Sequence, residues 1–301
     1  MKHLFMAFRK SAFFLLLFFI QLHAQKADLI IYSYDRPLQL YALLESIETY
    51  MTNVGSVQII YRSSNEAYEQ AYEQVWHDFE GLERYRQSDR PKEDFKPLTM
   101  QALARCEHDH VLFAVDDIIV KDVIDCDECI ALMEQHNAYG FYLRMGKHLR
   151  FCYPYGKNTK QPLPRFIADD GHVCIWRFAD GVLDWTYPNT VDMTIYRKED
   201  VQKAFASFHF TMPNTLEGAW ASRAGALRHR LGICYAVTKM VNLPLNRVQN
   251  DFHNAHMDFM SSQEMLNIFN DGKKIDTRPL HQINNLDAHM EYEPTFIERS
   301  A

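Results

Sequence analysis

The stretch DLIIYSYDRPLQLYALLESI, residues 28–47, changes from one structural pattern to another at its middle. It opens with a short apolar run that is typical of a buried strand. Asp35 and Pro37 are typical of a helix start, as N-cap and first-turn residue. The leucines and the isoleucine that follow recur at helical spacing. The stretch therefore predicts a strand, a turn and a helix, with Asp35 as the N-cap.

The same alternation of strand and helix continues along the first half of the chain. Strand-like and helix-like patterns follow one another at residues 56–61, 65–79, 82–87, 94–106 and 110–115. Three such repeats leading into a fourth strand predict an α/β fold, with a mostly parallel central sheet flanked by helices. Ligands bind beyond the carboxyl ends of the strands in such sheets. The candidate site residues are therefore 33–36, 61–65 and 116–117.

The second half is less regular. Residues 146–170 are rich in aromatic, basic and proline residues, which predicts a long loop over the sheet. Further strands are expected at 172–177, 191–196 and 232–238, and helices near 216–228 and 261–270.

Bulk composition bounds the class of protein. The 301 residues are 47% hydrophobic and 24% charged, as in an ordinary globular protein. The net charge of −7 disfavours a nucleic-acid partner, because such proteins are more often basic. Neither a GxGxxG dinucleotide fingerprint nor a phosphate-binding P-loop occurs.

Residues 1–24 differ from the remainder. They contain Lys2, Arg9 and Lys10, no acidic residue, an apolar run and a small residue at Ala24, which is the layout of a secretory signal. The run is shorter than the roughly 20 residues that a spanning helix needs. A cleaved signal peptide is therefore favoured over a short membrane anchor through residues 11–24. Both predict an exported or membrane-anchored protein, in a secretory lumen or the periplasm. A location at the cytoplasmic face of the membrane remains an alternative.

The cysteines offer a second motif to weigh. Cys126 and Cys129 have the spacing of a redox or zinc half-site, but no second such pair follows in the sequence. Their acidic neighbours raise a thiol pKa rather than lowering it. We therefore expect structural cysteines.

Two adjacent carboxylates stand out in HVLFAVDDIIVKD, residues 110–122. Asp116 and Asp117 lie between two apolar runs, where each charge is costly to bury unless a cation meets it. Carboxylate oxygens at a strand end suit Mg²⁺ or Mn²⁺, which take the rest of their ligands from phosphate and water. The alternative is a solvated turn in which Asp117 caps a helix.

Residues 28–47 and 95–120 together resemble family-2-like glycosyltransferases. The first stretch is similar to the family's strand, Thr-Tyr-Asn-Arg-Pro turn and helix, and the second to its helix, strand and Asp-x-Asp motif. Asp116 and Asp117 match the last two acids of the common triplet, while Val115 replaces the first. The resemblance implies the glycosyltransferase A fold, a nucleoside-diphosphate-sugar donor, and Mn²⁺ or Mg²⁺ on Asp116 and Asp117.

The resemblance also implies contacts to the donor. Tyr34, Asp35 and Arg36 match the first nucleotide-contacting loop. Arg62 stands in the loop where an acid usually reads the base or ribose, and Lys96 where a basic residue meets the diphosphate. Asp116 is expected to contact donor as well as metal.

The stretch NLPLNRVQNDFHNAHM, residues 242–257, matches a C-terminal segment that closes over the donor. Such segments add a metal ligand or a diphosphate contact. His253 is the expected ligand, with His256 and Arg247 as further candidates.

Glu217, in TMPNTLEGAWASR (211–223), matches the family's catalytic carboxylate at a helix start. An inverting transfer needs such a base near the acceptor hydroxyl. Asp184 and Asp180 are substitutes, and Trp185 and Trp220 are candidate platforms for a sugar. The alternative reading of Glu217 is a helix N-terminal charge favoured by the macrodipole.

These features together predict a metal-dependent glycosyltransferase that acts on an unidentified glycan, lipid or protein hydroxyl. Its single catalytic domain, 25–301, would comprise a nucleotide-binding half (27–125), an acceptor half (126–245) and a closing segment (246–301). One alternative is a non-catalytic exported carbohydrate-binding protein on the same fold. Another is a sugar-phosphate nucleotidyltransferase, which would normally carry a glycine-rich basic loop after the first strand. A metal phosphohydrolase would need more His and Asp ligands.

Overall fold

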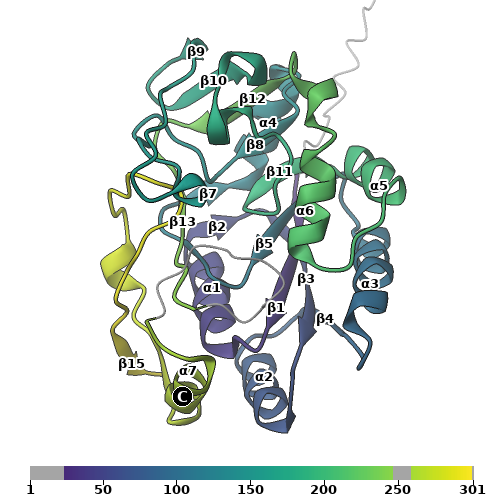
Figure 1. The fold of residues 1–301 in the computed structure, drawn as a ribbon, viewed down its shortest axis with the longest axis vertical. Coiled ribbons are helices and arrows are strands. Elements are labelled where there is room, and N and C mark those ends of the chain that lie inside the picture. Colours follow the sequence, from purple (N-terminus) through teal and green to yellow (C-terminus); the bar gives the residue numbers. More distant parts are fainter. Residues whose placement is uncertain (1–23, 247–258, 300–301) are drawn as a thin grey trace, which may run out of the picture.

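The computed structural model describes residues 24–246 and 259–299. Its centre is a nine-stranded sheet in the order β4-β3-β1-β5-β11-β8-β12-β10-β9 (Figure 1). The nine strands are β1 (Ala27–Tyr34), β3 (Val54–Arg62), β4 (Leu82–Arg86), β5 (His110–Val115), β8 (Gly140–Tyr142), β9 (Phe166–Asp169), β10 (Val173–Arg177), β11 (Thr194–Arg197) and β12 (Leu231–Tyr235). Within the sheet, β11 and β10 run against the rest. The predicted mostly parallel sheet is confirmed.

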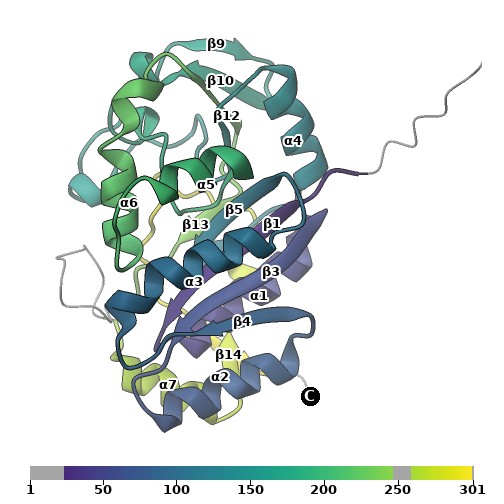
Figure 2. The ribbon, with the colours of Figure 1, turned by 90° about the vertical axis from the view of Figure 1, so that its right-hand side faces the viewer.

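Helices cover both faces of this sheet, as predicted. They are α1 (Pro37–Tyr50), α2 (Glu66–Asp78), α3 (Pro91–Arg105), α4 (Cys126–Gln135), α5 (Lys198–Ala206), α6 (Pro213–Ala221) and α7 (Ser262–Asn270). Figure 2 shows α3, α5 and α6 together on one side of the sheet. Alternation along β1 explains the two layers. Leu29 and Ile31 pack with α1, α2 and α7, whereas Ile30 and Tyr32 pack with α3, α5 and α6.

Short elements complete the chain. Short strands outside the main sheet are β2 (Met51–Thr52), β6 (Ile118–Val120), β7 (Ile124–Asp125), β13 (Met240–Asn242), β14 (Lys273–Ile275) and β15 (Phe296–Glu298). Single 3₁₀ turns are η1 (Tyr153–Tyr155), η2 (Phe178–Asp180), η3 (Leu183–Thr186), η4 (Ala224–Leu227) and η5 (Arg278–Leu280). The β6–β13 pair matters most here, because it pins residues 240–242 beside the chain that leaves β5.

The predicted N-cap of α1 is wrong. Helix α1 begins at Pro37, its N-cap position is Arg36, and no side chain caps it. Asp35 instead adopts a left-handed backbone (φ 52°). Its Oδ1 accepts a hydrogen bond of 2.8 Å from the backbone N–H of Ser64. The carboxylate thus ties the loop after β1 to the loop after β3.

The expected elements of the second half are present with shifted ends. Residues 172–177, 191–196 and 232–238 correspond to β10, β11 and β12, and the expected helices to α6 and α7. Helix α6 begins at Pro213, three residues earlier than predicted. Helices α4 and α5 and the short strand β8 were not predicted.

All six cysteines are buried and unpaired, which confirms the structural interpretation. Burial raises the pKa of the Cys126 thiol in α4 to about 12. Burial likewise raises the pKa of Cys129, whose sulfur lies 3.2 Å from the Tyr235 hydroxyl.

The predicted signal peptide or anchor lies almost wholly outside the described residues. Within the described part of the chain, no helix combines the length and apolarity needed to span a membrane.

Candidate active site

A cavity of about 820 Å³ opens beyond the carboxyl ends of β1 and β5, the edge that the sequence predicts for a site. Its walls come from the ends of β1 and β5, the starts of α1, α3 and α6, and the chain around 144, 153–155, 183–192, 242–246 and 289. The order of strands gives the cavity two ends, one on each side of the acidic pair at β5. We call them the donor end (Tyr34, Arg62, Lys92) and the far end (Arg144, Tyr155, Asp184, Tyr187).

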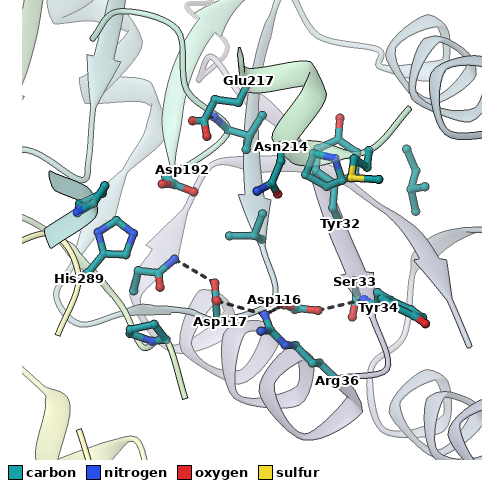
Figure 3. Close-up of a pocket in the computed structure, with 18 of the residues that line it drawn as sticks. Tyr32, Ser33, Tyr34, Arg36, Asp116, Asp117, Asp192, Asn214, Glu217 and His289 are labelled. Carbon is teal, nitrogen blue, oxygen red and sulfur yellow. Dashed lines mark hydrogen bonds and ion pairs between the residues drawn. The ribbon is translucent and has the colours of Figure 1, made fainter. Parts of the chain in front are cut away.

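Asp116 and Asp117 lie at the middle of the cavity, directly after β5 (Figure 3). The Nη1 of Arg36 lies 3.0 Å from Asp116 Oδ1 and 3.1 Å from Asp117 Oδ2. The other Asp116 oxygen accepts from the Tyr34 backbone N–H at 3.1 Å. The other Asp117 oxygen accepts from Asn242 Nδ2 at 2.9 Å. All four carboxylate oxygens therefore accept a hydrogen bond from this chain.

Arg36 is the cation that meets the acidic pair in this structure. Its Nη2 also donates to the backbone carbonyl of Asn246, so the guanidinium is fixed on three sides. Burial alone would lower the pKa of Arg36, but Asp116 and Asp117 raise it. Burial raises the pKa of Asp117 to about 6 against the opposing effect of Arg36. A buried pair of like charges that keeps one cation is a costly arrangement and is typical of functional sites.

Glu217 points into the same cavity from α6 (Figure 3). Its Oε1 accepts a hydrogen bond of 3.2 Å from the backbone N–H of Val191. Burial, and after it the charge of Asp192, raise the pKa of Glu217 to about 7. A carboxylate with such a pKa can take up a proton near neutral pH. Asp192 itself lies between Glu217 and the acidic pair (Figure 3).

Asp184 is on the cavity wall, but it is already paired. Its Oδ1 lies 2.9 Å from Arg144 Nη2, and both side chains are buried. The position is therefore better suited to holding Arg144 than to accepting a proton. The other substitute, Asp180, does not line the cavity; it sits in η2, 3.8 Å from Arg177.

Three further expectations are corrected. Lys96 turns away from the cavity, because its Nζ donates to the Phe208 carbonyl at 2.5 Å. Lys92, about one helical turn earlier, lines the cavity in its place. Trp185 and Trp220 cannot serve as sugar platforms, since both are fully buried in the core.

The residues expected to contact the nucleotide first, Tyr34, Asp35 and Arg36, do not all line the cavity. Tyr34 and Arg36 line the cavity, and so does Arg62, whose guanidinium lies 4.6 Å from the centre of the Tyr34 ring. Asp35 does not line it, because it is used in the bond to Ser64. The expected contacts from His253, His256 and Arg247 fall outside the described residues.

Several cavity residues carried no signal in the sequence. They are Arg144, Asp192 and His289. Asn242 and Asn246 also line the cavity; they belong to the predicted closing stretch 242–257, but no role was expected for either. Asn242 reaches Asp117 because β13 pairs with β6, placing it opposite Ile118. Burial alone would lower the pKa of His289, but Asp287 and Asp192 raise it.

The residues present fit a metal ion only if other ligands arrive with it. Among residues 24–246 and 259–299, no group of three or more His, Cys, Asp or Glu side chains is placed to hold a metal. Mg²⁺ and Mn²⁺ in phosphate-binding sites, however, often take just one or two carboxylates from the protein. Asp116 and Asp117 can supply these if Arg36 gives up part of its contact.

The chain is similar to a curated glycosyltransferase. This relative, the bifunctional glycosyltransferase pgtA of Dictyostelium discoideum, is 24% identical over 189 residues. The match covers 58% of this chain and 24% of pgtA, so the chain spans about a quarter of that relative. The resemblance to glycosyltransferases inferred from the sequence is thereby confirmed. No family model matches the sequence.

Solved structures give more distant likenesses. One is TarS residues 1–349 of S. aureus in complex with UDP, with a TM-score of 0.47 and 13% identity over 71% of this chain and 58% of that one. Another is the 4-diphosphocytidyl-2C-methyl-D-erythritol synthase of Anaerococcus prevotii, with a TM-score of 0.41 and 9% identity over 73% of this chain and 91% of that one. Both are too distant to carry a functional conclusion.

Proposed function

We propose that this protein transfers a sugar from a nucleoside diphosphate sugar to a hydroxyl acceptor, with Mn²⁺ or Mg²⁺ bound together with the donor. One observation carries the proposal. A carboxylate with a pKa near 7, Glu217, faces the Asp116–Asp117 pair across a single cavity at the carboxyl ends of β1 and β5. Such a cavity combines a site for a leaving diphosphate with a general base.

The donor end supplies the nucleotide site. The Tyr34 ring, backed by the Arg62 guanidinium, offers a flat surface to a base. Lys92 adds positive charge to the same cavity, and Arg36 adds it beside Asp116 and Asp117. A diphosphate carries negative charge, so the donor would lie with its base at Tyr34 and its diphosphate beside Arg36.

The metal would be held by Asp116 and Asp117. When bound, it would neutralise the charge that develops on the leaving diphosphate. Arg36 would then exchange part of its contact with the carboxylates for the diphosphate oxygens. Asn242 and the Tyr34 backbone N–H would keep the two carboxylates oriented throughout.

Glu217 would act as the base. It would take the proton from the acceptor hydroxyl while that oxygen forms a bond to the anomeric carbon. The bond from that carbon to the diphosphate breaks, and its electron pair leaves with the diphosphate. This sequence inverts the anomeric centre. Asp192 would assist by raising the pKa of Glu217.

A nucleotidyltransferase is less well supported, because the end of β1 and the turn that follows it, residues 33–36, contain no glycine and one basic residue. A non-catalytic carbohydrate-binding protein would keep the cavity but not need a base. Export or anchoring through residues 1–24 is a further part of the proposal.

Turnover of the donor tests the proposal. The full chain is incubated with UDP-, GDP- and CMP-linked sugars, with Mn²⁺ or EDTA, and the released nucleotide is measured. We expect release from one nucleotide class with Mn²⁺, and a fall of about 10²- to 10⁴-fold in Glu217→Gln. Binding of a donor without release by the wild type would favour the non-catalytic protein. Release that is unchanged in Glu217→Gln would remove Glu217 as the base.

A further inference from the structure

The two ends of the cavity differ in charge. The donor end presents Arg62 and Lys92, next to Arg36. Asp192 and Glu217 lie beside the far end, and its buried cation, Arg144, is already paired with Asp184 at 2.9 Å. A second anionic group would therefore meet carboxylates at the far end, whereas a neutral group would meet no such repulsion.

One wall of the far end is held rigidly. Trp185 of η3 is fully buried and packs edge-on against Trp176, with ring centres 4.9 Å apart. Trp176 Nε1 also donates to the Trp185 backbone carbonyl at 2.8 Å. Leu183 has a φ of 53°, a conformation that leucine adopts only where its surroundings enforce it. The anchored turn presents Leu183 and Tyr187 to the cavity.

A second part of the far-end wall is the turn η1. Tyr153 is buried, donates its hydroxyl to Glu291 at 3.1 Å, and stacks on His289 with ring centres 5.8 Å apart. Tyr155 projects from this anchored turn and is 69% exposed while lining the cavity. Tyr155 is also close enough to Tyr187 for the two to interact electrostatically. The far end therefore offers one exposed ring, Tyr155, and one half-buried ring, Tyr187, each beside an anchored turn.

We infer that the far end binds the acceptor, and that the acceptor is a neutral saccharide packed against Tyr155 and Tyr187 with one hydroxyl turned toward Glu217. The inference rests on the proposed function and deepens it by naming the acceptor class. The face of an aromatic ring carries partial negative charge. It therefore attracts the polarised C–H groups on one side of a pyranose ring. A phosphate-bearing acceptor would be repelled by the surrounding carboxylates, and a peptide would have less flat surface to pack on tyrosine.

Saturation-transfer difference NMR on the full chain tests this inference. Binding is measured in the presence of Mn²⁺ and UDP or GDP, whichever stabilises the protein. The probes are the methyl β-glycosides of glucose, galactose and N-acetylglucosamine, with glycerol 1-phosphate and N-acetylserine amide as competitors from other acceptor classes. We expect at least one glycoside to bind best, with its strongest signals on one face of the ring.

Variants locate the binding. Tyr155→Ala and Tyr187→Ala are expected to weaken glycoside binding about five- to tenfold, the value of one lost aromatic contact. Tyr50→Ala, which removes a tyrosine that does not line the cavity, is the matched control and should leave it unchanged. Because Tyr155 is largely exposed, its variant should fold normally.

Three results would overturn the inference while leaving the proposed function intact. They are nucleotide binding without glycoside binding, stronger binding of glycerol 1-phosphate or N-acetylserine amide than of every glycoside, and glycoside binding that neither tyrosine variant weakens. Failure of the proposed function would show instead in the turnover assay, as no metal-dependent release of nucleotide from any donor.

Discussion

At the scale of single residues, the central feature is the guanidinium of Arg36 between two carboxylates. Removing one partner of a buried ion pair is far more damaging than the net value of the pair, because a charge is left buried and unpaired. Arg36 serves Asp116 and Asp117 at once, at 3.0 and 3.1 Å. Its loss should therefore be felt in the stability of the whole protein.

We predict that Arg36→Met lowers the free energy of unfolding at pH 7 by about 3–5 kcal/mol, measured by urea denaturation. Arg62→Met is the control, since Arg62 lines the same cavity without an ion pair to these carboxylates, and it should cost less than about 1 kcal/mol. Equal losses of unfolding free energy in the two variants would show that the ion pairs of Arg36 with Asp116 and Asp117 add no stability of their own.

In the proposed function, the pKa of Glu217 sets the pH dependence of turnover. A base must be deprotonated to act, so the rate should rise with pH through about 7, the pKa of this carboxyl. Asp192→Asn removes a negative charge that raises this pKa, so the rising limb should move to lower pH. A pH–rate profile of donor turnover checks both. A rising limb at the same pH in Asp192→Asn and the wild type would show that Asp192 does not raise the pKa of Glu217.

At the scale of elements, the sequence predicts helices and strands that carry their own apolar period, and it does not predict elements without such a pattern. The alternation in residues 28–47 and 95–120 predicts β1, α1, α3 and β5, because each element carries its own apolar period. Helix α4 was missed because its first four residues have the spacing of a cysteine motif. Helix α5 offers only Val201 and Phe205 as buried residues, too few for a visible stripe.

The residues of the candidate site divide in the same way, into those that stand in a recognisable stretch of sequence and those that do not. Asp116, Asp117 and Glu217 stand in recognisable local stretches, and the structure brings them to one cavity. Asn242 and His289 come from distant segments whose position depends on the pairing of β13 and on the chain that follows α7. Pairing between strands 120 residues apart leaves no periodic pattern in either strand.

The role of Asp35 gives a prediction at this scale. As a link between the loops after β1 and β3, at φ 52°, it needs both an oxygen acceptor and tolerance of a left-handed backbone. Asp35→Asn keeps both and should cost less than about 1 kcal/mol, whereas Asp35→Ser should cost about 1–3 kcal/mol in urea denaturation. If Asp35 were a helix N-cap, serine would be tolerated as well as asparagine.

At the scale of the whole molecule, the order of strands in the sheet places the donor end and the far end of the cavity on either side of Asp116 and Asp117. The parallel strands β3 and β1 end at the basic donor end, while the chain that follows β8 and precedes β11 builds the far end with its carboxylates and tyrosines. The acidic pair at β5 stands between them. In the proposed function, this arrangement would keep the diphosphate of the donor on one side of the acidic pair and the proton acceptor on the other.

The most direct test of this account is the coupling between metal and nucleotide at Asp117. Isothermal titration of Mn²⁺ into the full chain is run with and without saturating UDP or GDP. We predict that the nucleotide tightens Mn²⁺ binding at least about tenfold in the wild type, and that the effect disappears in Asp117→Ala. Nucleotide binding that is equally strong with Mn²⁺ and with EDTA, and unchanged in Asp117→Ala, would contradict it.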